Sequence, residues 1–129
     1  LLEYGADVKV LDACRFTPLH WAARQCPAEV VKLLLRADAD VYAQDYEGKT
    51  PLHMVRDKDS VTLLLGNGAD IQARDHYGNT PLHEAAGCTI AFDSSVRPYL
   101  IEVVAVLLAH GADPNALNKA NESPLLKAI

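Results

Sequence analysis

Three short stretches of the chain are apolar at most positions. They cover residues 29–35, 60–65 and 102–108. Such runs are broader than the single apolar stripe of a surface helix, so they predict helices packed between neighbours. Gly68 and Gly111 follow the second and third runs, and glycine commonly ends a helix because it adopts left-handed backbone without strain.

A repeated phrase, Thr-Pro-Leu-His, predicts a second set of helices. It occurs at 17–20, 50–53 and 80–83, and a divergent copy, Ser-Pro-Leu-Leu, occupies 123–126. The threonine hydroxyl can cap free N–H groups at a helix start. Proline suits the first helical position, where its missing N–H has no partner to lose. Each of the first three phrases therefore marks a helix that precedes an apolar run.

The phrases recur with a regular period. Thr50 follows Thr17 by 33 residues, and Thr80 follows Thr50 by 30. Ser123 follows Thr80 by 43 residues, and an Ala-Asp pair repeats with the same three intervals. The period is therefore 33, with three residues lost from the second unit and ten added to the third. Two phrases repeating in register indicate stacked copies of one unit.

Tight turns are predicted at 45–48 and 75–78, where the final glycine supplies a positive φ. Arg15 takes the place of this glycine in the first unit, and Asp38 replaces the glycine that ends the later apolar helices. Left-handed backbone costs about 1–2 kcal/mol for an ordinary side chain. We therefore expect a looser hairpin in the first unit.

The phrase and its period resemble the ankyrin repeat, which has a 33-residue unit and a T-P-L-H-x-A signature. The resemblance covers essentially the whole chain. It implies an all-α repeat solenoid of stacked helix-turn-helix units joined by short β-hairpin loops, in a single domain. We expect the end of a preceding repeat, a full repeat, a shortened repeat, a repeat with an insertion near 88–98, and the start of a further repeat. These parts cover residues 1–11, 12–44, 45–74, 75–117 and 118–129.

Apolar residues at both ends of the chain would face a missing neighbour, whereas solenoids close with polar outer faces. We therefore expect the native array to be longer.

Composition and charge limit the classes of partner that the chain can bind. The 129 residues are 50% hydrophobic with a net charge of −5 and no basic run, which argues against nucleic acid and anionic membrane surfaces. No stretch approaches the roughly 20 apolar residues of a membrane span. Three cysteines without framework spacing favour reduced thiols, and hence a cytoplasmic or otherwise intracellular protein.

The histidines and cysteines raise the question of catalysis or metal binding. His20, His53 and His83 share one repeat position, and the resemblance implies that their rings bond to backbone and tie adjacent repeats. No nucleophile recurs with them. Cys14, His20 and Cys26 are evenly spaced, but a helix keeps the last two about 9 Å apart, which is too far to share zinc. We expect no catalytic residue, no metal, no cofactor and no small-molecule substrate.

Positions that differ between units indicate the exposed surface. The hairpin tips, the residue before each capping hydroxyl and the residue after each repeated histidine vary in charge and size. The resemblance implies that they line a concave binding groove, where Trp and Tyr are favoured as anchors. Packing against the neighbouring helix is the alternative interpretation of Trp21. The predicted contact residues are Phe16, Trp21, Arg24, Tyr46, Glu47, Lys49, His76, Tyr77 and Asn79.

The insertion in the third unit is the most individual feature. It lies between Gly87 and Glu102, at the inter-helix location where the second unit lacks three residues near Met54. It can fill the gap beside its short neighbour, or it can form a rim that contacts a partner. Its candidate contact residues are Phe92, Arg97 and Tyr99.

The sequence therefore predicts a non-catalytic scaffold that binds a partner protein through the concave groove of hairpin tips and first helices. A preorganised groove loses little freedom when it docks a partner. One alternative is a regulatory or substrate-recognition module of a larger enzyme, channel or ubiquitin-ligase adaptor. A second alternative is an enzyme in its own right.

Overall fold

The computed structural model describes residues 11–25, 27–89 and 98–124, with the side chains of 88–89 and 98–100 left out. Its helices are α1 (Pro18–Gln25), α2 (Ala28–Arg36), α3 (Pro51–Met54), α4 (Lys58–Gly66), α5 (Pro81–Thr89) and α6 (Pro98–Ala109). The described ranges contain no strand. Each of the three Thr-Pro-Leu-His phrases begins a helix at its proline, as predicted.

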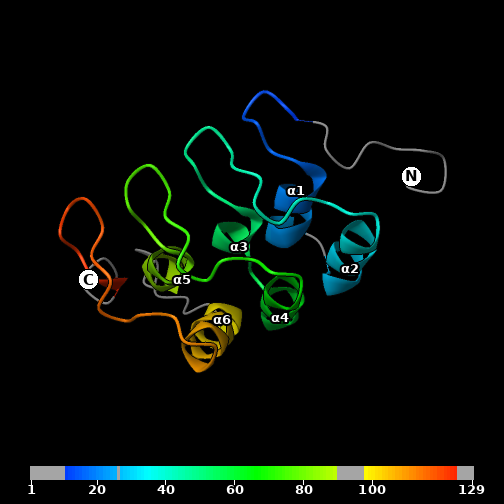
Figure 1. The fold of residues 1–129 in the computed structure, drawn as a ribbon. Helices are drawn as coiled ribbons and strands as arrows, with labels where there is room; N and C mark the ends of the chain where they lie inside the picture. Colours follow the sequence, from blue (N-terminus) through cyan, green and yellow to red (C-terminus); the bar gives the residue numbers. More distant parts are fainter. Residues whose placement is uncertain (1–10, 26, 90–97, 125–129) are drawn as a thin grey trace.

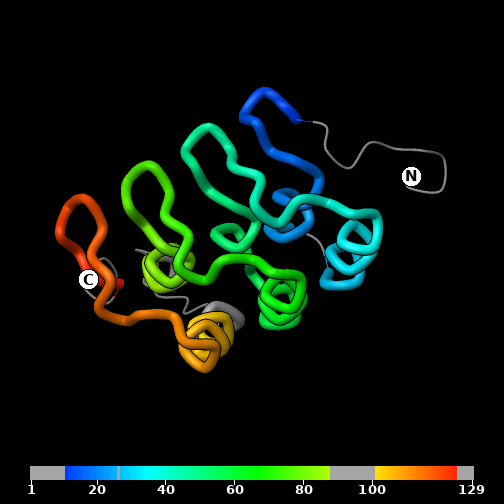
Figure 2. The backbone as a smooth tube through the Cα atoms, in the orientation of Figure 1, coloured from blue at the N-terminus to red at the C-terminus, as the bar shows by residue number. Residues whose placement is uncertain are grey.

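The helices form two layers. Helices α1, α3 and α5 lie side by side in one row, and α2, α4 and α6 lie side by side in the other (Figure 1). Hairpin-shaped loops project together from the edge of the first row (Figure 2). The shared core contains a leucine from each first helix and a valine or leucine from each second helix, and all are almost completely buried. The predicted all-α repeat fold is confirmed.

The repeated histidines hold consecutive units together. The Nδ1 atom of each ring accepts the backbone N–H of the threonine in its own phrase at 3.1 Å, so the proton is on Nε2. Each Nε2 then donates to a backbone carbonyl of the next unit. These carbonyls belong to Lys49, Asn79 and Glu122, at 2.8, 2.9 and 2.8 Å. The structural interpretation of His20, His53 and His83 is confirmed.

The hairpins are aligned by a second repeated device. In each one, the first side chain accepts two backbone N–H groups through Oδ1, which closes the turn. These side chains are Asp12, Asp45, Asp75 and Asn118. One backbone hydrogen bond also joins each pair of neighbouring hairpins. Its donors are Tyr46, His76 and Lys119, and its acceptors are Cys14, Glu47 and Tyr77. The tips therefore form rows along the stack.

Arg15 and Asp38 adopt the left-handed backbone expected at glycine positions, with φ of 65° and 63°. The hairpin of the first unit is nevertheless closed like its neighbours. Arg15 N–H donates to the Asp12 carbonyl at 2.9 Å, and Asp12 N–H donates to the Phe16 carbonyl at 3.0 Å. The expected loosening is not observed, because the same turn bonds form despite the strained residue.

The second unit is shortened at its first helix. Helix α3 has four residues, whereas α1 has eight and α5 has nine. Residues 90–97 lie outside the described part of the chain, and so do the contacts proposed there for Phe92 and Arg97. Tyr99 belongs to α6, but its side chain is not described. The choice between gap-filler and rim therefore stays a prediction.

Candidate partner-binding groove

Two adjoining hollows lie along the face formed by the hairpin tips and the first helices. The first, of about 370 Å³, is bordered by α1, α3 and α5. The second, of about 670 Å³, lies between the last three hairpins. Both are lined in part by Glu47, Lys49 and Glu84. Together they form one continuous groove on the predicted binding face.

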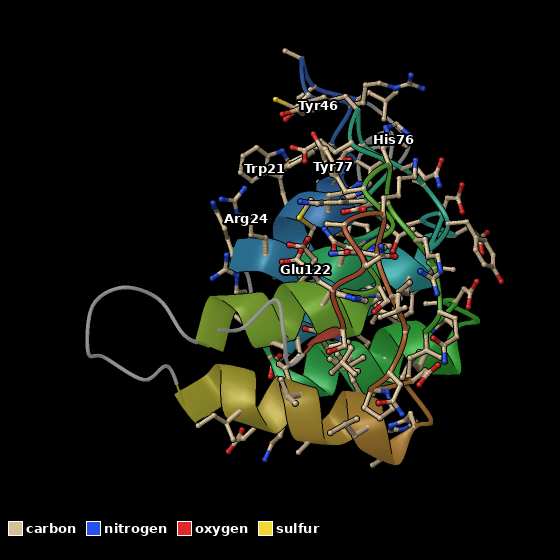
Figure 3. The ribbon with its side chains drawn as sticks, turned by 90° about the vertical axis from the view of Figure 1, so that its left-hand side faces the viewer. Trp21, Arg24, Tyr46, His76, Tyr77 and Glu122 are labelled. Carbon is tan, nitrogen blue, oxygen red and sulfur yellow. The ribbon has the colours of Figure 1, made fainter. Side chains whose placement is uncertain are left out.

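Eight of the nine predicted contact residues line this groove. Tyr46 and Tyr77 expose 58% and 57% of their surface at the tips of two neighbouring hairpins. Trp21 and Arg24 project from α1 to the same side, below the tip that carries Tyr46 (Figure 3). The structure thus brings aromatic and cationic side chains together on one face.

Phe16 and Asn79 are exceptions to the predicted exposure. Phe16 is only 8% exposed: its ring stacks on His20 at 5.5 Å between centroids and meets Trp21 edge-on at 5.1 Å. Asn79 is buried and its Oδ1 accepts the Nδ2 donor of Asn118 at 2.9 Å. The predicted exposure of this position was wrong for both residues, and their contact with a partner stays a prediction. The position before the capping threonine lies between units, so its variation reflects different neighbours rather than solvent.

His76 is exposed, as predicted, but it does not line either hollow. Figure 3 shows it on the other side of the hairpin row from Trp21. A methyl group added to Gly48 would lie 2.6 Å from the His76 ring. The imidazole therefore packs against the neighbouring hairpin and holds the two tips together.

Trp21 is held by residues of its own unit on one side and is exposed on the other. Its Nε1 donates to an Asp12 carboxylate oxygen at 2.9 Å, and its ring contacts Phe16. It is nevertheless 40% exposed and lines the first hollow. An aromatic ring fixed on one side and free on the other suits a binding anchor.

The acidic side chains of the groove already have partners. Lys49 lies 3.5 Å from the carboxylates of both Glu47 and Glu84. Burial acts to lower the pKa of Lys49, but the charges of Glu84 and Glu47 outweigh it and raise the pKa. Asp45 is buried, and its Oδ1 accepts the N–H groups of Glu47 and Lys49 at 2.8 and 2.9 Å. Lys49 therefore stays charged and balances the charge of one of the two glutamates.

Val55 and Arg56 also line the first hollow, although neither was predicted as a contact. Both directly follow the shortened α3. The signal that could have found them is the three-residue deletion itself, because the residues after a shortened helix border the space of the missing turn. A comparison of equivalent positions alone does not reveal a residue that takes the place of a missing turn.

The described residues include no group of three or more side chains able to hold a metal ion. The repeated histidines have their Nδ1 atoms occupied by backbone N–H groups. Burial lowers the pKa of His20 and of His53, because the charged form loses hydration. The groove therefore offers shape and charge, and its histidines are committed to structural bonds. None of the described helices is long and apolar enough to cross a bilayer.

The family model for ankyrin repeats in three copies matches residues 1–75 and 47–118. The chain belongs to the ankyrin repeat family. It is similar to the palmitoyltransferase AKR1 of Debaryomyces hansenii and to that of Candida albicans, each 37% identical over 57 residues, which cover 44% of this chain and 7% of the relative. The palmitoyltransferase AKR1 of Saccharomyces cerevisiae is 37% identical over 61 residues, 47% of this chain and 8% of the relative. The chain thus matches a small part of these relatives.

Proposed function

We propose that this chain is a non-catalytic module that binds a partner protein along the groove of hairpin tips and first helices. The observation that carries the proposal is the row of exposed Trp21, Tyr46 and Tyr77 on one preformed face. Backbone bonds between hairpins fix the spacing of the tips before any partner arrives. A rigid aromatic surface gains contact area with little loss of conformational freedom. The exposed, unpaired thiol of Cys14 supports an intracellular setting.

The test is recovery of partners from a cell extract on the immobilised chain, compared with the Tyr46→Ala/Tyr77→Ala variant. We expect the specific partners to be lost, because truncating a central aromatic anchor commonly costs about 2 kcal/mol or more. Tyr42→Ala is the matched control: Tyr42 is 60% exposed but lines a separate hollow with Leu35 and Asn67. Partners retained by the double variant, at unchanged melting temperature, would refute the proposed surface.

A second candidate follows from the relatives, which are named as palmitoyltransferases. In this proposal the chain is the ankyrin module of a larger enzyme and selects the protein on which that enzyme acts. The isolated chain would then show no acyl transfer. The Tyr46→Ala/Tyr77→Ala change in the whole protein would reduce transfer to the protein substrate and leave enzyme autoacylation unchanged. Equal loss of both reactions would exclude a role in substrate selection.

A further inference from the structure

The shortened repeat opens a pocket within the groove. Helix α3 ends at Met54, about one turn earlier than its neighbours would place it. The first hollow lies at this position, and its apolar lining includes Met54, Val55 and Ala85. Trp21 and Phe16 add aromatic surface from the α1 side. A volume of about 370 Å³ lies at the small end of the range of about 300–1,000 Å³ for ligand pockets, which suits one large side chain.

Two arginines in the lining have no anionic partner among the described residues. Arg24 comes from the last turn of α1 and Arg56 follows α3. Neither forms an ion pair with a described residue. The three acidic side chains that share the lining are engaged elsewhere, two by Lys49 and one by backbone N–H groups. The lining as a whole carries three acidic and three basic side chains, and the cations without an ion pair among the described residues are these two arginines.

We infer that the pocket receives a peptide segment of the partner protein that places one aromatic or large aliphatic side chain beside an aspartate or glutamate. The apolar lining accepts the large side chain, and the guanidinium groups can bind the carboxylate through paired N–H donors. The chain as a whole carries a net charge of −5, so its overall charge does not attract an acidic segment. Two uncompensated arginines therefore set the position of docking. This inference rests on the proposed function of the groove.

The test is selection of peptides from a random phage-displayed library on the intact chain, followed by titration of fluorescein-labelled synthetic versions. We expect the enriched sequences to pair an aromatic or large aliphatic residue with an acid within a few positions. Binding of these peptides should weaken about tenfold in Arg24→Gln/Arg56→Gln, which corresponds to about 0.7 kcal/mol per charge. It should also weaken in 0.5 M salt. Lys32→Gln/Arg36→Gln is the matched control, since these exposed cations of α2 lie outside the pocket.

The inference fails if the enriched peptides carry no acidic residue, if their affinity is the same in the arginine variant, or if both double variants lose affinity equally. It also fails if no peptide is enriched. The same experiment tests the proposed binding surface independently of this inference. Peptides that ignore the arginines but depend on Tyr46 and Tyr77 would overturn this inference and leave the proposed protein-binding surface intact. Peptides that ignore both pairs of residues would contradict the two proposals together.

Discussion

Replacing Gly78 by alanine tests how closely consecutive hairpins approach. Gly78 has φ of 79°, and a Cβ added to it would lie 2.8 Å from the Lys119 backbone nitrogen and 3.2 Å from the Asn118 Cα. Gly111 offers a matched comparison. Its φ is 92°, and an added Cβ would have no atom within 4 Å. The two positions share backbone strain but differ in free space.

The expected losses differ accordingly. Gly111→Ala should lower the free energy of unfolding by about 1 kcal/mol, from left-handed strain alone. Gly78→Ala adds displacement of a neighbouring backbone, which as overpacking costs about 1–3 kcal/mol. It also weakens the 2.9 Å bond from Lys119 N–H to the Tyr77 carbonyl, worth about 1 kcal/mol. We therefore expect a total of about 3–5 kcal/mol for Gly78→Ala.

The assay is urea unfolding monitored by far-UV circular dichroism. The free energies of unfolding of two variants are compared at the mean of their midpoint urea concentrations. Gly66→Ala serves as the control, because Gly66 ends α4 without left-handed backbone and its added Cβ would meet nothing. It should be neutral or stabilising by up to about 1 kcal/mol. Equal losses for Gly78→Ala and Gly111→Ala would show that the hairpins are not in contact, and the proposed preorganisation of the tips would be wrong.

Three further outcomes follow from the repeated positions. Arg15→Gly should raise the free energy of unfolding by about 0.5–1 kcal/mol, since it relieves a φ of 65° at some cost in chain entropy; a destabilised variant in urea would contradict this. His53→Ala should lose about 3 kcal/mol or more, because it leaves two buried backbone groups unpaired, while exposed His110→Ala should change little; equal effects in the same titration would refute the inter-repeat role. The folded-state pKa values of His20 and His53 are lowered by burial, so the unfolded chain binds more protons in mild acid. Stability should be full above about pH 6.5 and should fall as the pH drops toward the folded-state values, by at most about 1.4 kcal/mol per pH unit for each histidine; a flat profile between pH 7 and 5.5 would contradict this.

The features that could be predicted from the sequence are those satisfied within one unit or between equivalent positions. Proline at the helix start and threonine as its cap act over a few residues, so the repeated phrase was enough to place α1, α3 and α5. The bond from each histidine to the next unit was expected only because the resemblance to the ankyrin repeat implies it. Positive φ at Arg15 and Asp38 followed from the glycines at equivalent positions.

The burial of Phe16 could not be predicted in this way. At its position the second unit has Lys49, whose side chain is only 18% exposed because two carboxylates compensate its charge. The third unit has Asn79, which is buried against Asn118. At this one position Phe16 and Asn79 are buried and Lys49 is partly buried, each with a different partner. Variation of the side chain between units therefore shows that its packing partner differs from unit to unit. It does not show that the side chain is exposed to solvent.

This distinction also explains where specificity can arise in such a stack. The residues that repeat are engaged in holding it together: the histidines bond to the next unit and the turn carboxylates bond to their own backbone. A surface built only from them would be the same in every unit and could not select one partner register over another. Selection requires a feature that occurs once, and the described groove has such a feature where α3 is short and Arg56 follows it. If the proposed partner binds there, it can contact the exposed Tyr46 and Tyr77 in only one register, because the missing helical turn occurs at one place in the described groove.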